Sequence, residues 1–237
     1  MNRIIPFSQS KTKLKQFRSS HPVSEELRQF LLSDIHIEFL NYLIDNYLED
    51  YYLALKQFSN EHHVKEEKRR TLMLNLFWWR VLYDLEDHYI NHVNNFMAEN
   101  PHKFWKKPFV TSWFKEWEKT APSLYDVSYI YRDNIFVVRD ICTLESFNIV
   151  VYHSKATPPH KEEILLGTLL PIGDDFYFPV TDFYHFGFSE SKDVAAYLNY
   201  LYHKHLKDDS KLLGFIRILS SVLNLENKTP LEQLQTP

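Results

Sequence analysis

Three residues stand at a spacing that could build a metal site on one face of a helix. Asp84, His88 and His92 follow one another at intervals of four residues. On a continuous helix this interval places side chains on the same face, where one carboxylate and two imidazoles can ligate a metal. The pattern raises the hypothesis of a metal-dependent hydrolase. The residues that could complete such a site from elsewhere in the chain are Asp45, Glu49 and His62.

The same spacing has a simpler interpretation. Asp84 can begin a helix, because a carboxylate is favourable at a helix N-terminus. His88 and His92 can then be partly exposed partners of neighbouring acids. Spacing along a single helix often arises by coincidence, so we favour this interpretation and predict no metal site. The hydrolase stays as an alternative.

A second group of residues is suited to binding. Aromatic residues make up 16% of the chain, and most of them must pack in the core. Period-2 alternation predicts two sets that each share one strand face: Tyr125, Val127, Tyr129 and Tyr131, and Phe176, Phe178 and Val180. Aromatic side chains exposed beside arginines can stack on bases or grip a peptide. The predicted binding residues are Tyr129, Tyr131, Arg132 and Arg139.

The composition argues against several classes of catalyst. The chain has four glycines, and none precedes Gly167. Phosphate-binding loops need clustered glycines, because only a residue without Cβ lets backbone amides close around an anion. No dinucleotide fingerprint, P-loop or nucleophile elbow is present. Cys142 is the only cysteine, so we expect a core residue in a reducing compartment, and we predict no cofactor.

Charge is unevenly distributed along a chain whose net charge is −4. Residues 1–24 carry five basic residues and no acid, whereas residues 25–60 carry seven acids and two bases. We predict that residues 1–23 form a flexible basic arm near an acidic helical face. The alternative is an arm that binds nucleic acid.

Residues 24–122 are predicted to form a helical domain. Ser24 precedes two glutamates, which is typical of a capped helix start. The stretch TLMLNLFWWRVLYDL at 71–85 is apolar nearly all round and predicts a central helix. An apolar stripe at spacings of three and four predicts a long helix before it: Leu40, Leu43, Ile44, Tyr47, Leu48, Tyr51, Leu55 and Phe58.

After Pro122 the period changes from 3.6 residues to 2. Five short strands fit within residues 123–188, which is the size of a small, partly open antiparallel barrel of SH3 or OB type. Helices return in residues 189–237 and are expected to pack on the rest. The predicted class is α+β, with an N-terminal helical region, a five-stranded antiparallel barrel-like sheet and C-terminal helices.

Several segments between Phe77 and Phe186 resemble an uncharacterised group of bacterial proteins. They are WWRVLYDL, NNFMAENP, SWFKEWEKTAPSLYDV, VVRDICTLESFNIVV and EILLGTLLPIGDDFYF. Members of this group often end in a SEC-C motif, a short zinc module, and have a turn resembling Asp140–Glu145 and a segment resembling Gly167–Pro171. The resemblance implies a helical half, a small barrel and a helical tail, without known catalytic residues. With one cysteine, this chain lacks the zinc module, so a ribosome or translocation role does not carry over.

These observations predict a non-enzymatic, cytoplasmic adaptor or inhibitor that binds a protein partner through an aromatic-rich surface. No run approaches the roughly 18–20 apolar residues that span a bilayer, and no secretory signal is visible, so no membrane partner is expected. Two alternatives stay open. One is the hydrolase centred on Asp84, His88 and His92, and the other is a single-stranded nucleic-acid binder that uses the β region and the basic arm.

Overall fold

Three consecutive helical segments near the N-terminus of the chain form one long continuous helix. It consists of α1 (Glu25–Phe30), the π-helical segment η2 (Leu31–His36) and α2 (Ile37–Glu61). This description comes from a computed structural model that describes residues 16–82, 92–188, 191–205 and 211–232. The Ser24 hydroxyl accepts a hydrogen bond from the backbone N–H of Leu27 at 3.4 Å, which confirms the predicted helix start.

The π-helical segment changes which residues face the core. Its wider turn puts consecutive residues on the buried side, so Leu31 and Leu32 are both buried, and so are Ile35 and His36. The segment therefore widens the buried face of the run where it meets the other helices.

Further helices complete the N-terminal region. They are α3 (Glu66–Leu82), α4 (His92–Glu99), α5 (Pro101–Phe104), α6 (Pro108–Phe114) and the 3-10 helix η3 (Lys115–Lys119). Pro101 and Pro108 each begin a helix, a position where the missing N–H costs nothing. The helices enclose an aromatic core in which the Phe39 ring meets Phe114 and Trp117 edge-on, at centroid distances of 4.8 and 5.0 Å.

The β region forms a closed ring of five strands with a sixth strand added at one side. The strands are β1 (Pro122–Arg132), β2 (Ile135–Asp140), β3 (Ser146–Val150), β4 (Ile164–Gly173), β5 (Phe176–Pro179) and β6 (Tyr184–Phe186). The order β1-β2-β3-β5-β4 closes because β4 also pairs with β1, and β6 pairs with the start of β4. The predicted α+β class and the small barrel are thus confirmed, although the barrel is closed where a partly open one was predicted.

The sheet is mixed, so the prediction of a purely antiparallel sheet was wrong. β3 and β5 run parallel, with Asn148 opposite Phe176 and Ile149 opposite Tyr177. Parallel neighbours need a crossover connection, and β4 lies within that connection. The period-2 pattern shows which face of a strand is buried but carries no information about the direction of its neighbour.

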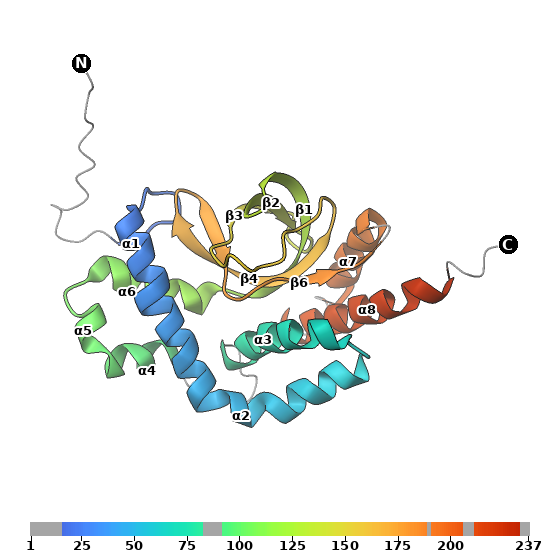
Figure 1. Cartoon of the computed structure of the whole chain (residues 1–237), viewed down its shortest axis with the longest axis horizontal. Helices are drawn as coiled ribbons and strands as arrows, with labels where there is room; N and C mark the ends of the chain where they lie inside the picture. Colours follow the sequence, from blue (N-terminus) through green and yellow to red (C-terminus); the bar gives the residue numbers. More distant parts are fainter. Residues whose placement is uncertain (1–15, 83–91, 189–190, 206–210, 233–237) are drawn as a thin grey trace, which may run out of the picture.

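Buried side chains form two clusters. One fills the barrel and consists of Tyr125, Val127, Phe136, Val138, Ile149, Leu165, Leu169 and Phe183. The larger one lies between the barrel and the helices, so β4, which faces both, is buried along its whole length. The C-terminal helices α7 (Ser191–His205) and α8 (Lys211–Glu232) join this layer, and α8 lies beside α3 under the barrel in Figure 1. None of the described helices is long and apolar enough to cross a membrane.

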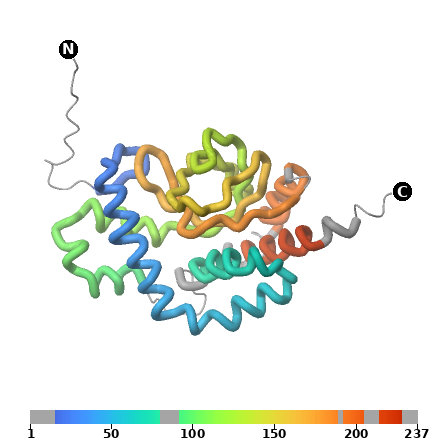
Figure 2. Tube along the Cα trace, in the orientation of Figure 1, coloured from blue at the N-terminus to red at the C-terminus, as the bar shows by residue number. Residues whose placement is uncertain are grey.

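The segment predicted as a basic arm is packed from Phe17 onward, while residues 1–15 lie outside the described residues. Phe17 and Val23 are each 6% exposed. The backbone N–H of Phe17 donates to Ser112 Oγ at 2.6 Å. The carbonyl of His21 accepts from the backbone N–H of Asp174 at 3.1 Å. Figure 2 shows the segment lying against the hairpin between β4 and β5.

Candidate functional site

The two tyrosines predicted to bind a partner lie on the outside of the barrel. Tyr129 is 56% exposed and Tyr131 is 64% exposed. Their rings meet edge to face with centroids 4.7 Å apart. Arg132 follows directly and is exposed, as is Arg139 on the neighbouring strand β2. We call these four residues the tyrosine surface.

The alternation predicted along β1 was wrong beyond Val127. Val127 and Tyr129 pair with consecutive residues of β2, so Ser128 is an extra residue in the strand. A second irregularity leaves Tyr131 as another extra residue. A bulge shifts the side-chain parity of a strand by one. Tyr129 therefore turns outward, while Ile130 packs against the barrel interior.

A pocket of about 560 Å³ adjoins the tyrosine surface, between the barrel and α7. The side chain of Asn199 helps to hold α7 there, because its Nδ2 donates to the carbonyl of Ile141 at 2.5 Å. Leu144 also lines the pocket and is 58% exposed, which leaves an apolar side chain open to a ligand. Polar and charged residues that line it include Asp126, Ser128, Arg139, Glu162 and Lys192.

Two of the cations beside the tyrosines are paired with carboxylates, whereas the exposed Arg132 and Lys161, which lines the pocket, form no ion pair among the described residues. Arg139 Nη2 lies 2.5 Å from Asp126 Oδ2, and Lys192 Nζ lies 2.9 Å from Glu162 Oε1. These two pairs reduce the net field that the surface offers to a polyanion, and they place carboxylates among its cations. The arrangement favours a partner of mixed charge over nucleic acid at this surface.

The turn between β2 and β3 holds the only cysteine in an unreactive state. Asp140 Oδ1 accepts hydrogen bonds from the backbone N–H groups of Cys142 and Thr143, at 2.7 and 2.9 Å. Burial, together with the charge of Asp140, raises the pKa of the Cys142 thiol to about 12. A thiol that stays protonated is a poor nucleophile. The prediction that Cys142 is a core residue is confirmed.

The candidate metal ligands of the hydrolase alternative are only partly within the described chain. Asp84 and His88 lie outside it. His92, in the first turn of α4, is 7% exposed, and its ring centroid lies 4.4 Å from that of Tyr47. Among the described residues, no three or more His, Cys, Asp or Glu side chains are grouped so that they could hold a metal ion.

The three residues considered as a fourth ligand do not lie together at a metal site. Asp45 and Glu49 are exposed on α2. The Nδ1 atom of His62 lies 2.9 Å from the carbonyl oxygen of Phe58, and the two rings stand 4.2 Å apart. The His62 side chain therefore contacts Phe58 at the C-terminal end of α2.

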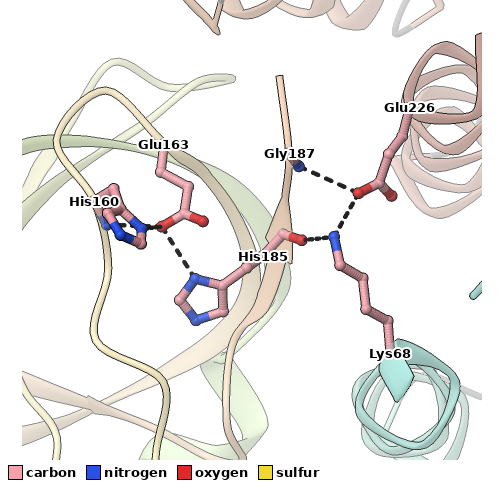
Figure 3. Close-up of polar contacts among 6 residues, drawn as sticks. All are labelled: Lys68, His160, Glu163, His185, Gly187 and Glu226. Carbon is pink, nitrogen blue, oxygen red and sulfur yellow. Dashed lines mark hydrogen bonds and ion pairs between the residues drawn. The ribbon is translucent and has the colours of Figure 1, made fainter. Parts of the chain in front are cut away.

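A polar cluster on both sides of β6 joins the barrel to the helices (Figure 3). Glu163 Oε2 accepts from the backbone N–H of His160 at 2.8 Å and lies 3.0 Å from His185 Nδ1. On the other side, Lys68 Nζ donates to the carbonyl of His185 and to Glu226 Oε1, both at 2.6 Å. These contacts tie α3 and α8 to the edge strand. The carboxylates of Glu163 and Glu226 both contact donors of the chain itself. The cluster therefore stabilises the packing of the helices on the barrel.

Replacing Glu163 with glutamine is expected to flatten the acid side of the stability profile. Burial raises the pKa of Glu163, but hydrogen bonds from His185 and His160 outweigh it and hold that pKa below its usual value of 4.5. The native carboxylate therefore stabilises the fold above pH 4.5, and this contribution is lost as the pH falls below it. Urea denaturation should show Glu163→Gln less stable by about 1–2 kcal/mol at pH 7. The difference should shrink at pH 3.5, and parallel profiles for the two proteins would contradict the expectation.

The sequence did not predict that residues of α7 line the pocket. Ala195 and Ala196 are small enough to let the helix approach the barrel, and Asn199 completes the contact. The available signal was an asparagine next to the apolar stripe of this helix. That signal does not say which strand the helix meets, because the approach depends on tertiary packing.

Comparison with known proteins adds no family to these observations. No protein-family model, no curated protein and no solved structure matches this chain. The resemblance to bacterial proteins that carry a SEC-C motif therefore stays a prediction. The function has to be inferred from the geometry of the surfaces described above.

Proposed function

We propose that this chain is a non-enzymatic adaptor or inhibitor that binds a protein partner through the tyrosine surface. The observation that carries the proposal is the outward position of Tyr129 and Tyr131, which the bulges in β1 impose. Most aromatic side chains near them, such as Tyr125 and Phe136, are buried in the barrel. Two large apolar rings exposed side by side on a rigid sheet are characteristic of interaction sites.

The chemistry of the surface supports a protein partner. Tyrosine and arginine are enriched among the residues that dominate binding energy in protein interfaces. The neighbouring pocket, with the exposed Leu144 and two ion pairs, offers a place where an apolar side chain of the partner can insert between polar contacts. Pairing of Arg139 with Asp126 weighs against a phosphate backbone here. A reduced, buried Cys142 supports a cytoplasmic location.

The double substitution Tyr129→Ser and Tyr131→Ser is expected to weaken partner binding by at least about 30-fold. Both side chains are more than half exposed, so the free energy of unfolding should change by less than about 0.5 kcal/mol. The test is affinity purification from a native extract with the wild-type chain and the variant as baits, followed by quantitative mass spectrometry.

Tyr52→Ser provides the matched control, because Tyr52 is 45% exposed on α2 and lies outside the tyrosine surface. A protein recovered with wild type and with Tyr52→Ser, but lost with the double variant, supports the proposal. If all three baits recover the same proteins in equal amounts, the tyrosines are not the recognition site.

A further inference from the structure

An open groove of about 600 Å³ lies between α5, α6 and the start of η3, outside the tyrosine surface. Trp105 lies in the connection between α5 and α6 and is 72% exposed. Tryptophans of this chain are otherwise buried, with at most 6% exposure for each of the other four. Residues that line the groove include Gln16, Met97, Trp105, Lys106, Lys107 and Lys115.

The connection that presents Trp105 is held by its own backbone. Trp105 N–H donates to the carbonyl of Pro101 at 2.7 Å, and Lys107 N–H donates to that of Phe104 at 2.9 Å. Between them, Lys106 has a φ of 58°, in the left-handed region that lysine rarely adopts. Phe104 turns inward and is 7% exposed, so the next residue is driven outward.

The groove is positively charged. Lys106 Nζ lies 4.3 Å from the centroid of the Trp105 ring, and Lys107 Nζ lies 5.1 Å from that of Phe30. None of the described residues that line the groove is acidic. Within the described residues, Lys106, Lys107 and Lys115 have no carboxylate within ion-pair distance. Lysines outside the groove do form ion pairs with carboxylates, as in Lys68–Glu226 and Lys192–Glu162.

We propose that this groove binds single-stranded nucleic acid, with one base stacked on Trp105 and the backbone phosphates beside the three lysines. An exposed aromatic ring within a basic groove is the arrangement that such binding uses without sequence preference. Lysines act here as point charges, which suits a phosphate backbone of variable geometry. Gln16 adds an amide to the lining that can hydrogen-bond to a nucleotide.

Charge and shape also distinguish this occupant from an anionic membrane. Interfacial binding requires a broad apolar face that inserts into the headgroup region. Here Trp105 stands alone, because Phe104 beside it is buried. The open lining with its three lysines offers charge to a phosphate backbone but no second exposed aromatic ring to insert into a bilayer. The tyrosine surface plays no part in this inference. The proposal of nucleic-acid binding in the groove and the proposal of protein binding at the tyrosine surface can therefore fail independently.

The test uses the full chain and a fluorescein-labelled oligouridine of roughly ten nucleotides. Because Trp105 is the exposed tryptophan, unlabelled oligouridine should quench protein fluorescence and shield it from acrylamide. By anisotropy, Trp105→Ala should weaken binding about 5- to 100-fold, whereas Trp105→Phe should retain most of it, because a phenyl ring still stacks. Changing the three groove lysines to glutamine should reduce the salt dependence, with a log–log slope smaller by about 2.

The matched control changes Lys65, Lys155 and Lys204 to glutamine, since these are exposed lysines outside the groove that alter the net charge equally. Circular dichroism establishes that each variant is folded. Three results would overturn the proposal. They are no binding at low salt, equal losses in the groove and control triples, and binding of phosphatidylserine vesicles with a Trp105 blue shift but no binding of oligouridine.

Discussion

Gly173→Ala is expected to destabilise the fold by about 2–5 kcal/mol. Gly173 ends β4 with a φ of +95°, where a residue with a side chain is strained. A Cβ at this position would overlap the Cγ2 atom of Val23 and lie 3.0 Å from the carbonyl oxygen of His21. The substitution therefore adds backbone strain and displaces the packed N-terminal segment from the hairpin. Urea denaturation of the two proteins at pH 7 measures the loss.

Gly187→Ala is the control for this substitution, because a Cβ there would meet nothing within 4 Å. It should change the free energy of unfolding by less than about 1 kcal/mol. Adding Val23→Ala to Gly173→Ala should recover part of the loss, since it removes the overlapping methyl group. A Gly173→Ala chain as stable as wild type would show that residues 16–23 do not pack on the hairpin as described.

Between pH 7 and pH 4.5 the His36→Phe variant is expected to gain about 2–3 kcal/mol of stability relative to the wild-type chain. His36 ends the π-helical segment, stacked at 25° to Trp117 and edge-on to Phe178 at 5.0 Å. Burial lowers the pKa of its imidazole from 6.5 to about 3. The folded state thus keeps the ring neutral, while the unfolded chain takes up a proton below pH 6.5. Stability is therefore lost as the pH falls from 6.5 toward 3.

Phenylalanine keeps the aromatic contacts of His36 but cannot become charged. At pH 7 the two proteins should differ by less than about 1.5 kcal/mol, because the substitution is similar in shape and Nδ1 has no hydrogen-bond partner among the described residues. Denaturant titrations between pH 7 and 4.5 follow the divergence. His203→Phe, at an exposed position of α7, should leave the pH slope unchanged. An equal slope for His36→Phe and wild type would place the histidine in contact with solvent.

Local periodicity was sufficient to predict the elements that repeat one pattern. The stripe from Leu40 to Phe58 lies within α2, and each of the five predicted strands is present. Local periodicity could not predict which distant strands pair with one another. The parallel contact of β3 with β5 depends on where β5 returns in space, and β6 has three residues, too few to show an alternation.

The candidate sites were predictable to different degrees. Tyr129 and Tyr131 were identified by residue type, but their exposure depends on an extra residue at Ser128, which no local pattern reveals. Most aromatic residues were expected in the core, where the other four tryptophans are, so Trp105 was not among the predicted binding residues. A signal was nevertheless present in KFWKKP, where a tryptophan stands among lysines immediately before a proline that begins a helix.

Site-specific photocrosslinking tests most directly whether this chain works by contact through the tyrosine surface. Benzoylphenylalanine would replace Tyr131 in one full-length protein and Tyr52 in another, and each would be irradiated in a native extract. We expect one discrete protein adduct from position 131, no such adduct from position 52, and its loss when Tyr129→Ser is added. Identical adducts from both positions, or no adduct from position 131, would contradict the proposed function.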